Sequence, residues 1–221
     1  MFLAGSLTNV FLQLSKQFEA DNPGVIVNFS STVSADIAKQ IVGGAPADVF
    51  APAGNTAMKT LTDAMKADGL PVIFATNVLE IATAPGNPKG IVSFADLAEP
   101  GVRVSVCDPT AACGMETVKV EQAAGVILRP VSEKTSLDSV LSQVTTGQAD
   151  AGLVYVTDVV AATSTVQGVM FPESSTAVTD YPIAVIKGAS EPDLAKRFVQ
   201  LVTGKTGQTM LKAAGFGTKA P

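Results

Sequence analysis

Residues 2–18, FLAGSLTNVFLQLSKQF, decide the fold class of this chain. The stretch opens with three apolar residues, as a core strand does, and then passes through Gly5 and Ser6. Apolar residues then recur at i, i+3, i+4, i+7 and i+11, the spacing of one face of an amphipathic helix: Leu7, Val10, Phe11, Leu14 and Phe18. A strand that runs directly into a helix is the building unit of an α/β protein.

The same unit recurs along the rest of the chain. An apolar run at 25–29 is expected to form a buried strand, and Ser34 precedes a second amphipathic helix. Further strands are expected at 47–51, 102–106, 151–156 and 181–186, and further helices at 115–124, 137–144 and after Ser190. Strands alternating with helices of this length predict an α/β fold with mostly parallel sheets and helices on both faces.

Two long β-rich runs, Asn77–Thr83 and Tyr181–Ile186, flank the middle third of the chain. They would serve as two hinge crossovers if the middle third formed a lobe of its own. We therefore predict lobe I from residues 1–78 plus 184–221, and lobe II from residues 79–183. Both ends of the chain would then belong to the same lobe.

Composition excludes several classes of function. The 221 residues contain 15 Lys plus Arg and 20 Asp plus Glu, so the formal charge is 15 − 20 = −5. The sequence has no histidine, which excludes Ser-His-Asp and Cys-His catalysis and any histidine-ligated metal site. The acidic balance argues against a nucleic-acid partner, because affinity for a phosphate backbone comes mainly from clustered Lys and Arg.

The chain is not expected to cross a membrane, because no run reaches the roughly 18 apolar residues that a spanning helix needs. Its first residues lack the basic start and long apolar region of a signal peptide. We interpret them as the first strand of a mature domain, with a leader absent from this chain.

The expected helix starts are candidate anion sites. Ser6, Ser34 and Ser136 each stand where a helical pattern begins and are predicted to be N-caps, and Cys113-Gly114 precedes a fourth helix. A helix start carries backbone N–H groups without intrahelical acceptors and a partial positive charge. In an open α/β sheet, such starts gather beyond the carboxyl ends of the strands. A serine cap, however, commonly does no more than satisfy its own helix.

The cysteines and tyrosines leave alternatives open. Cys107 and Cys113, with five residues between them, could form a disulfide, a redox pair or two free thiols. Tyr155 and Tyr181 are the only tyrosines, and a tyrosine in a strand usually belongs to the core. The scattered aspartates form no metal-binding pattern, and the chain has no phosphate-binding glycine loop.

Several segments together resemble the periplasmic molybdate-binding proteins, the solute receptors of ATP-driven molybdate importers. The order and spacing of these segments run across nearly the whole chain: Ala4-Gly5-Ser6-Leu7-Thr8-Asn9, Ser34 with Ala38-Lys39-Gln40-Ile41, Gly44-Ala45-Pro46-Ala47-Asp48-Val49-Phe50, Asp108-Pro109 with Gly114, Gly152-Leu153-Val154-Tyr155, and Tyr181-Pro182-Ile183-Ala184-Val185. The resemblance implies the two-lobed type II fold of periplasmic binding proteins, with the lobes closing over a tetrahedral oxyanion.

The resemblance also implies a ligand set from five segments: Ser6, Ser34, Cys113, Leu137 and Tyr155. In such receptors, serine hydroxyls, backbone N–H groups and the tyrosine hydroxyl hold the anion. Molybdenum would enter only as molybdate through these residues, and no cofactor or catalytic residue is implied.

The sequence departs from the family pattern at three points. Position 113 is Cys where the family usually has Ala, and the Asp108-Pro109 loop is one residue shorter than usual. The approach to Ser34 is longer than usual, which leaves Ser30 and Ser31 as alternatives to it. Leu137 stands for the usual Val, a mild change if its backbone does the binding.

The resemblance implies the partners and the location as well. The expected ligands are molybdate and tungstate, and the expected protein partners are the membrane permease and ATPase subunits of an importer. We expect a monomer that does not bind nucleic acid, located outside the cytoplasm, either free in the periplasm or lipid-anchored at the cell surface.

Three other functions compete with this interpretation. A receptor on the same fold could take another tetrahedral oxyanion such as sulfate or phosphate, since cavity radius is invisible in sequence. A ligand-sensing module of a transcription regulator is disfavoured because the chain carries no basic patch or helix-turn-helix. An enzyme using Cys113 or Ser6 as nucleophile is disfavoured because no base accompanies either residue in the motifs.

Overall fold

A computed structural model describes residues 1–109, 111–134 and 136–218. The chain divides into two compact units: unit 1, made of Met1–Thr76 and Thr179–Pro221, and unit 2, Asn77–Val178. The chain therefore passes between the units at 76–77 and at 178–179. No helix within the described ranges is both long enough and apolar enough to span a bilayer.

The lobes were expected to divide after residues 78 and 183, and the two compact units divide after residues 76 and 178. Asn77 already belongs to unit 2, where its side-chain amide donates to the Thr157 hydroxyl at 2.9 Å. Thr179 begins a strand of the unit 1 sheet, so that strand belongs to unit 1 over its whole length.

Unit 1 is built on a sheet with the strand order β2-β1-β3-β10-β4. Its strands are β1 (Phe2–Ala4), β2 (Ser30–Thr32), β3 (Val49–Ala51), β4 (Ala67–Asn77) and β10 (Thr179–Ile186). Its helices are α1 (Thr8–Asp21), α2 (Ser34–Val42), α3 (Asn55–Asp63), α7 (Pro192–Thr203) and α8 (Lys205–Ala213), and a short 3-10 helix, η1 (Gly5–Leu7), follows β1. Strand β1 is parallel to β2 and β3, whereas β10 runs antiparallel to β3.

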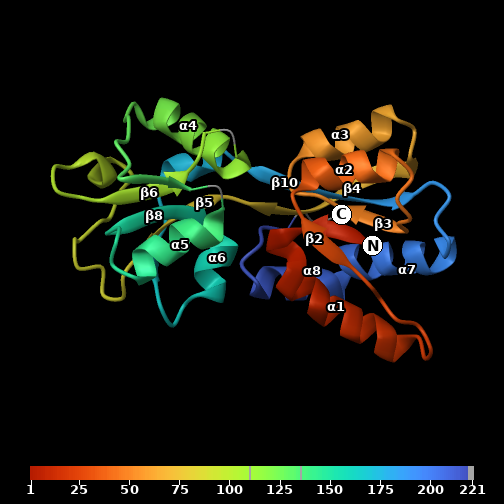
Figure 1. Ribbon diagram of the computed structural model, residues 1–221. Coiled ribbons are helices and arrows are strands. Elements are labelled where there is room, and N and C mark those ends of the chain that lie inside the picture. Colours follow the sequence, from red (N-terminus) through yellow and green to blue (C-terminus); the bar gives the residue numbers. More distant parts are fainter. Residues whose placement is uncertain (110, 135, 219–221) are drawn as a thin grey trace. The chain divides into compact units, whose positions relative to one another are not determined.

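Helices cover both faces of this sheet (Figure 1). Successive side chains of a strand point to opposite faces, and β10 shows this alternation. Tyr181, Ile183 and Val185 belong to the apolar cluster formed with α1, α7 and α8. Ala184 and Ile186 belong to the cluster formed with α2 and α3.

Unit 2 is built on a sheet with the strand order β7-β6-β8-β5-β9. Its strands are β5 (Leu79–Thr83), β6 (Val104–Cys107), β7 (Ser132–Lys134), β8 (Ala151–Tyr155) and β9 (Gln167–Val169). Its helices are α4 (Ala112–Ala124), α5 (Leu137–Thr145) and α6 (Val156–Ala161), with two 3-10 helices, η2 (Ala95–Ala98) and η3 (Pro172–Thr176). Strand β6 is parallel to β7 and β8, whereas β5 is antiparallel to β8 and β9.

Both sheets are therefore mixed, and the parallel strands are those of the strand–helix units. Strands β1, β2 and β3 in unit 1, and β6, β7 and β8 in unit 2, each lead into a helix. The strands beside the crossings between units, β10 and β5, run antiparallel to these sets. The carboxyl ends of each parallel set consequently meet at one edge of their sheet.

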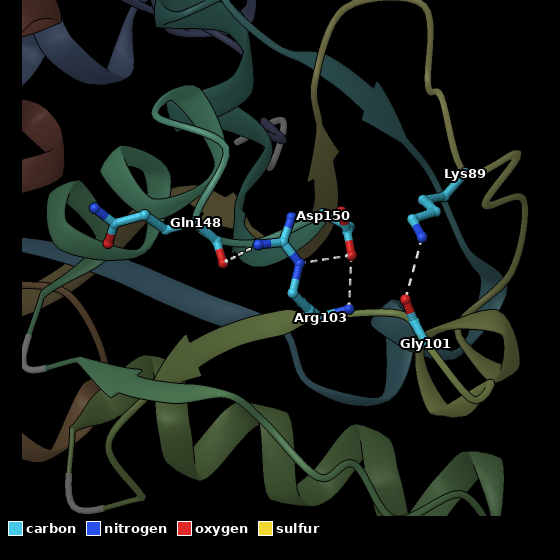
Figure 2. Close-up of polar contacts among 5 residues, drawn as sticks. All are labelled: Lys89, Gly101, Arg103, Gln148 and Asp150. Atoms are coloured by element: carbon cyan, nitrogen blue, oxygen red, sulfur yellow. Dashed lines mark hydrogen bonds and ion pairs between the residues drawn. The ribbon is translucent and has the colours of Figure 1, made fainter.

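An ion pair ties the opposite, amino-terminal edge of the unit 2 sheet (Figure 2). Arg103, just before β6, donates to the Asp150 carboxylate, just before β8, through its backbone N–H at 2.9 Å, Nε at 3.2 Å and Nη2 at 2.9 Å. Its Nη1 also donates to the Gln148 carbonyl at 3.0 Å. Hydrogen bonds from the Arg103 guanidinium hold the pKa of the Asp150 carboxyl below its ordinary value. The Arg103 cation thus lies at the end of β6 away from Cys107.

The strand expected at 25–29 is wrong, because the strand of this segment is Ser30–Thr32. The backbone N–H of Val27 donates to the Glu19 carboxylate at 2.7 Å, which takes it away from a sheet ladder. Pairing with β1 begins nearby, where the Met1 amino group donates to the Asn28 carbonyl at 2.8 Å. The shift brings the strand to within two residues of Ser34.

Candidate anion-binding site

In unit 1, the strand register brings Ser6 and Ser34 to the same edge of the sheet. Strands β1 and β2 are parallel and end opposite each other, with Ala4 paired to Thr32. Ser6 and Ser34 each stand two residues beyond these strand ends. The carboxyl edge of parallel strands is where open α/β sheets bind ligands, so the two serines lie where an anion site is expected.

Ser6 does not cap a helix, contrary to the expectation from sequence. It lies within η1, whose N-cap residue is Ala4. Its Oγ atom is 3.0 Å from the hydroxyl oxygen of Tyr181. The Tyr181 side chain is completely buried and makes edge-to-face contacts with Phe74, at 6.5 Å between ring centroids, and with Phe216, at 5.2 Å. The core of unit 1 therefore holds the partner of the Ser6 hydroxyl in place.

Ser34 is also not an N-cap, because it is the first residue of α2 and Val33 occupies the cap position. The Oγ atom of Ser34 accepts a hydrogen bond from the backbone N–H of Ala53 at 3.1 Å. Ala53 follows β3, so the side chain joins the start of α2 to the end of a neighbouring strand. The first hydrogen bond within α2 is donated by the N–H of Asp36, so the N–H groups before it point out of the helix start.

In unit 2, three parallel strands end at one edge, and a candidate residue lies at or after the end of each of them. Cys107 of β6 pairs with Lys134 of β7, and Ser105 of β6 pairs with Gly152 of β8, so the three carboxyl ends are aligned. Cys113 follows β6, Leu137 follows β7, and Tyr155 is the last residue of β8. Each unit thus gathers its own candidates, Ser6 with Ser34 in unit 1 and the other three in unit 2.

A disulfide joins Cys107, the last residue of β6, to Cys113, the second residue of α4. This bond settles the choice between a disulfide and free thiols that the sequence left open. Next to it, Gly114 packs so closely that a Cβ atom there would overlap the Asp108 carbonyl oxygen. The covalent ring and this close backbone approach together hold the first turn of α4 against the end of β6.

Leu137 begins α5 directly after a capped position. Ser136 is the N-cap of this helix, as expected, and its Oγ accepts the Ser139 N–H at 3.3 Å. The Leu137 side chain is partly buried and packs against the core of unit 2. A ligand at this helix start would consequently meet the backbone N–H of Leu137 and not its side chain.

Tyr155 ends β8 and is the N-cap residue of α6. Its backbone N–H donates to the Asp158 carboxylate at 2.9 Å and so joins the end of β8 to the first turn of α6. Burial raises the pKa of Asp158 to about 6, a change that the Tyr155 N–H opposes and the nearby Asp138 reinforces. The Tyr155 side chain is itself buried in the unit 2 core.

Sequence reasoning missed the roles of Tyr181 and Ala53 beside the two serines. Tyr181 was quoted only as part of a resembling segment and was otherwise assigned to the core, and nothing in the sequence singles out a backbone N–H at Ala53. Within the described parts of the chain, no group of three or more Cys, Asp or Glu side chains could hold a metal ion.

Comparison with known proteins shows the family of this chain. Residues 1–217 match the family model described as "Bacterial extracellular solute-binding protein". The chain belongs to this family. The solute-binding protein is 48% identical to the molybdate-binding protein ModA of Mycobacterium tuberculosis H37Rv over 216 residues, which cover 98% of this chain and 83% of the relative. Family membership confirms that the chain is a binding protein and not an enzyme.

Solved structures share the fold of this solute-binding protein. The periplasmic molybdate-binding protein of Azotobacter vinelandii matches with a TM-score of 0.82 and 24% identity, covering 99% of this chain and 98% of that one. The sulfate-binding protein SubI of Mycobacterium tuberculosis matches with a TM-score of 0.79 and 21% identity, covering 100% of this chain and 86% of that one. These matches confirm the periplasmic-binding-protein fold, and the family is one that acts outside the cytoplasm.

Proposed function

We propose that this chain is the receptor that captures molybdate, and also tungstate, and delivers it to an ATP-driven importer. The observation that carries the proposal is the 48% identity, over 98% of the chain, to a protein named as a molybdate-binding protein. At this identity and coverage, a shared ligand is the simplest expectation. The chemistry of the candidate residues is consistent with it.

The proposed ligand set consists only of hydrogen-bond donors toward the anion. It comprises the hydroxyls of Ser6, Ser34 and Tyr155 and the backbone N–H groups at Cys113 and Leu137. Hydrogen bonds to a charged group contribute roughly 1.5–3 kcal/mol each, so five or more of them can offset the loss of anion hydration. A set of donors without acceptors suits an oxyanion that carries no proton, as molybdate does at neutral pH.

Ser34, and not Ser30 or Ser31, is the proposed ligand in its segment. Ser30 and Ser31 lie within β2, and the Ser31 side chain is exposed. Ser34 alone of the three begins a helix, where its hydroxyl and the N–H groups of the first turn can act on the same anion. The longer approach to this helix, compared with the family pattern, therefore does not change the proposed residue.

We also propose the protein partners and the location of this receptor. The importer's permease and ATPase subunits are the proposed protein partners, and the receptor acts as a monomer without nucleic acid or a cofactor. A relative from Bacillus subtilis, 26% identical over 225 residues, is named as a putative substrate-binding lipoprotein. The proposed location is therefore either free in the periplasm or at the cell surface through a lipid anchor.

A receptor for sulfate or phosphate is the second candidate, because a sulfate-binding protein has the same fold. A thermal-shift panel with molybdate, tungstate, sulfate and phosphate tests both. At 100 times its dissociation constant, a ligand adds about 2.7 kcal/mol to the free energy of unfolding. We expect molybdate and tungstate to raise the melting temperature at micromolar concentration. A rise with sulfate or phosphate and none with millimolar molybdate would reject the proposed ligand.

A further inference from the structure

The segment that enters unit 2 stays paired with the chain around Tyr155 beyond the end of strand β8. Within the sheet, Leu79 of β5 lies opposite Tyr155 of β8 in an antiparallel register. One step further along the same register, the backbone N–H of Val156 donates to the Val78 carbonyl at 3.1 Å. The pairing therefore continues past the strand to the first residue of α6.

Side chains make the next contact of this register, because the main chain has by then turned into α6. The side-chain amide of Asn77 donates to the Thr157 hydroxyl at 2.9 Å, and its oxygen accepts the backbone N–H of Val78 at 3.1 Å. Asn77 is 2% exposed and Thr157 is 7% exposed, so water competes little for this bond. A buried side-chain bond thus ties the segment that enters unit 2 to the second residue of α6.

This bond bears on Tyr155, the proposed ligand at the turn from β8 into α6. The Tyr155 side chain is buried in the unit 2 core, so the direction of its ring follows the backbone at this turn. The hydroxyl lies at the far end of the ring, and a small rotation of the backbone moves it further than the Cα atom. Hydrogen bonds weaken steeply when their geometry is lost, so the turn must be held for the hydroxyl to bind well.

We propose that Asn77 is a positioning residue of the anion site. Its bond to Thr157 holds the first turn of α6, and with it the Tyr155 hydroxyl, in the place where the oxyanion binds. Asn77 acts through Thr157 and does not touch the ligand. It is also the residue at which the chain enters unit 2, so one side chain adjoins the crossing and supports a ligand group. The inference rests on the proposed function, because it takes Tyr155 as a ligand of the oxyanion.

Thr157→Val tests the proposal, because it removes the hydroxyl, keeps the shape of the side chain and leaves the crossing at 76–77 unaltered. We expect about threefold to tenfold weaker molybdate binding by calorimetry, since a displaced Tyr155 hydroxyl loses part of a hydrogen bond to an anion. Thr157→Ser keeps the hydroxyl and should bind molybdate within about twofold of the unaltered chain. An unchanged affinity in Thr157→Val would overturn the proposal.

Thr83→Val is the matched control at the other end of β5. Thr83 is also a buried threonine of unit 2, and its hydroxyl oxygen lies 3.2 Å from each of two backbone carbonyl oxygens. It is opposite Ala151, the first residue of β8, whereas Tyr155 is the last. Thr83→Val should lower the melting temperature and leave the molybdate affinity within about twofold. An equal loss of affinity in Thr83→Val and Thr157→Val would overturn the proposal, since affinity would then follow stability alone.

A double-mutant cycle separates an effect through Tyr155 from a general one. In a Tyr155→Phe background the hydroxyl is absent, so Thr157→Val should change the molybdate affinity less than about twofold. An equal loss in both backgrounds would overturn the proposal. If Thr157→Val does not fold, Asn77→Ser lacks the amide, breaks the same bond from its other end and should show the same dependence on Tyr155.

Fluorine NMR reads the position of the ring without any ligand. The sequence has two tyrosines, so a chain labelled with ring-fluorinated tyrosine gives signals from two residues, and Tyr155→Phe identifies those of Tyr155. Thr157→Val should shift or broaden the Tyr155 signal and leave that of Tyr181, in unit 1, in place. Thr83→Val should move neither. An unmoved Tyr155 signal in Thr157→Val would reject the positioning role, whereas failure of the unaltered chain to bind molybdate would reject the proposed function itself.

Discussion

The Oγ atom of Ser34 accepts a hydrogen bond from the backbone N–H of Ala53 at 3.1 Å. Replacing Ser34 by alanine removes the proposed bond to the ligand and also leaves this N–H without its acceptor. We predict that Ser34→Ala weakens molybdate binding by about 1–3 kcal/mol, the usual cost of deleting one partner of a buried hydrogen bond. Isothermal calorimetry measures the change.

Ser31→Ala is the matched control for that experiment. Ser31 lies three residues earlier, on β2, with an exposed side chain. Its removal should change the affinity by no more than about 0.5 kcal/mol, as for most surface substitutions. If Ser31→Ala weakened binding as much as Ser34→Ala does, the choice of serine would be wrong.

Reduction of the Cys107–Cys113 disulfide should loosen the start of α4 and lower both stability and molybdate affinity. The two residues lie six positions apart, and closing a loop of this size stabilises a fold by about 2 kcal/mol in the chain-entropy model. Melting curves and calorimetry with and without a phosphine reductant measure the two effects. Reoxidation should restore both, and a Cys107→Ser, Cys113→Ser chain should not respond to the reductant. Equal affinity in the oxidised and reduced states would contradict a role for this loop in binding.

Gly114→Ala should damage the same loop by a different route. The added Cβ would overlap the Asp108 carbonyl oxygen, so the backbone at the start of α4 must shift. Overpacking of this kind costs about 1–3 kcal/mol of stability, and molybdate affinity should fall with it. Gly5→Ala is a suitable control, because a Cβ there meets nothing within 4 Å although the residue adjoins Ser6. Urea titration measures the stability and calorimetry the molybdate affinity. If both values for Gly114→Ala equalled those of the unaltered chain, the close approach of Gly114 to Asp108 would not matter for either.

Glu80→Gln should make the protein more stable above neutral pH. Glu80 lies in β5, 7% exposed, and burial raises its pKa from 4.5 to about 7. Because the pKa of Glu80 is higher in the folded state than in the unfolded state, proton binding to Glu80 stabilises the fold. This contribution is fully present below about pH 4.5 and is lost as the pH rises through about 7. A difference of one in pKa corresponds to about 1.4 kcal/mol, so the substitution should add roughly 3 kcal/mol at pH 8.5.

The measurement for Glu80 is urea unfolding at pH 5 and pH 8.5, since the gain from Glu80→Gln should be much smaller at the lower pH. Glu133→Gln, at an exposed position on β7, serves as the control and should show no such difference between the two pH values. A gain of equal size at both pH values would mean that removal of the carboxylate charge is not the cause.

The strand–helix units could be predicted from sequence because their signal is local. The apolar spacing from Leu7 to Phe18 marks α1 correctly, and its members are buried together against α7 and α8. The strand expected at 25–29 failed because the Glu19 carboxylate, eight residues earlier, takes the N–H of Val27. A side chain that competes for one backbone group leaves no trace in a hydrophobic pattern.

For the candidate site as well, the sequence predicted some features and missed others. The positions of Ser6 and Ser34 beyond strand ends followed from the sequence, but their assignment as helix caps was wrong. The partners that replace the caps lie 175 residues away for Ser6 and 19 residues away for Ser34. Such contacts exist only after the sheet has formed, because the pairing of β1 with β3 and of β3 with β10 brings these segments together.

The state of the disulfide between the end of β6 and the start of α4 depends on the compartment in which the receptor is produced. Disulfides form in oxidising compartments and are rare in the cytosol. A copy synthesised and kept in a reducing cytoplasm would have the same sequence and the same sheets but an open loop at Cys113. Preparations of this chain from the cytoplasm and from the periplasm of a bacterial host should therefore differ covalently at the proposed binding loop. Only the periplasmic preparation is expected to contain the disulfide.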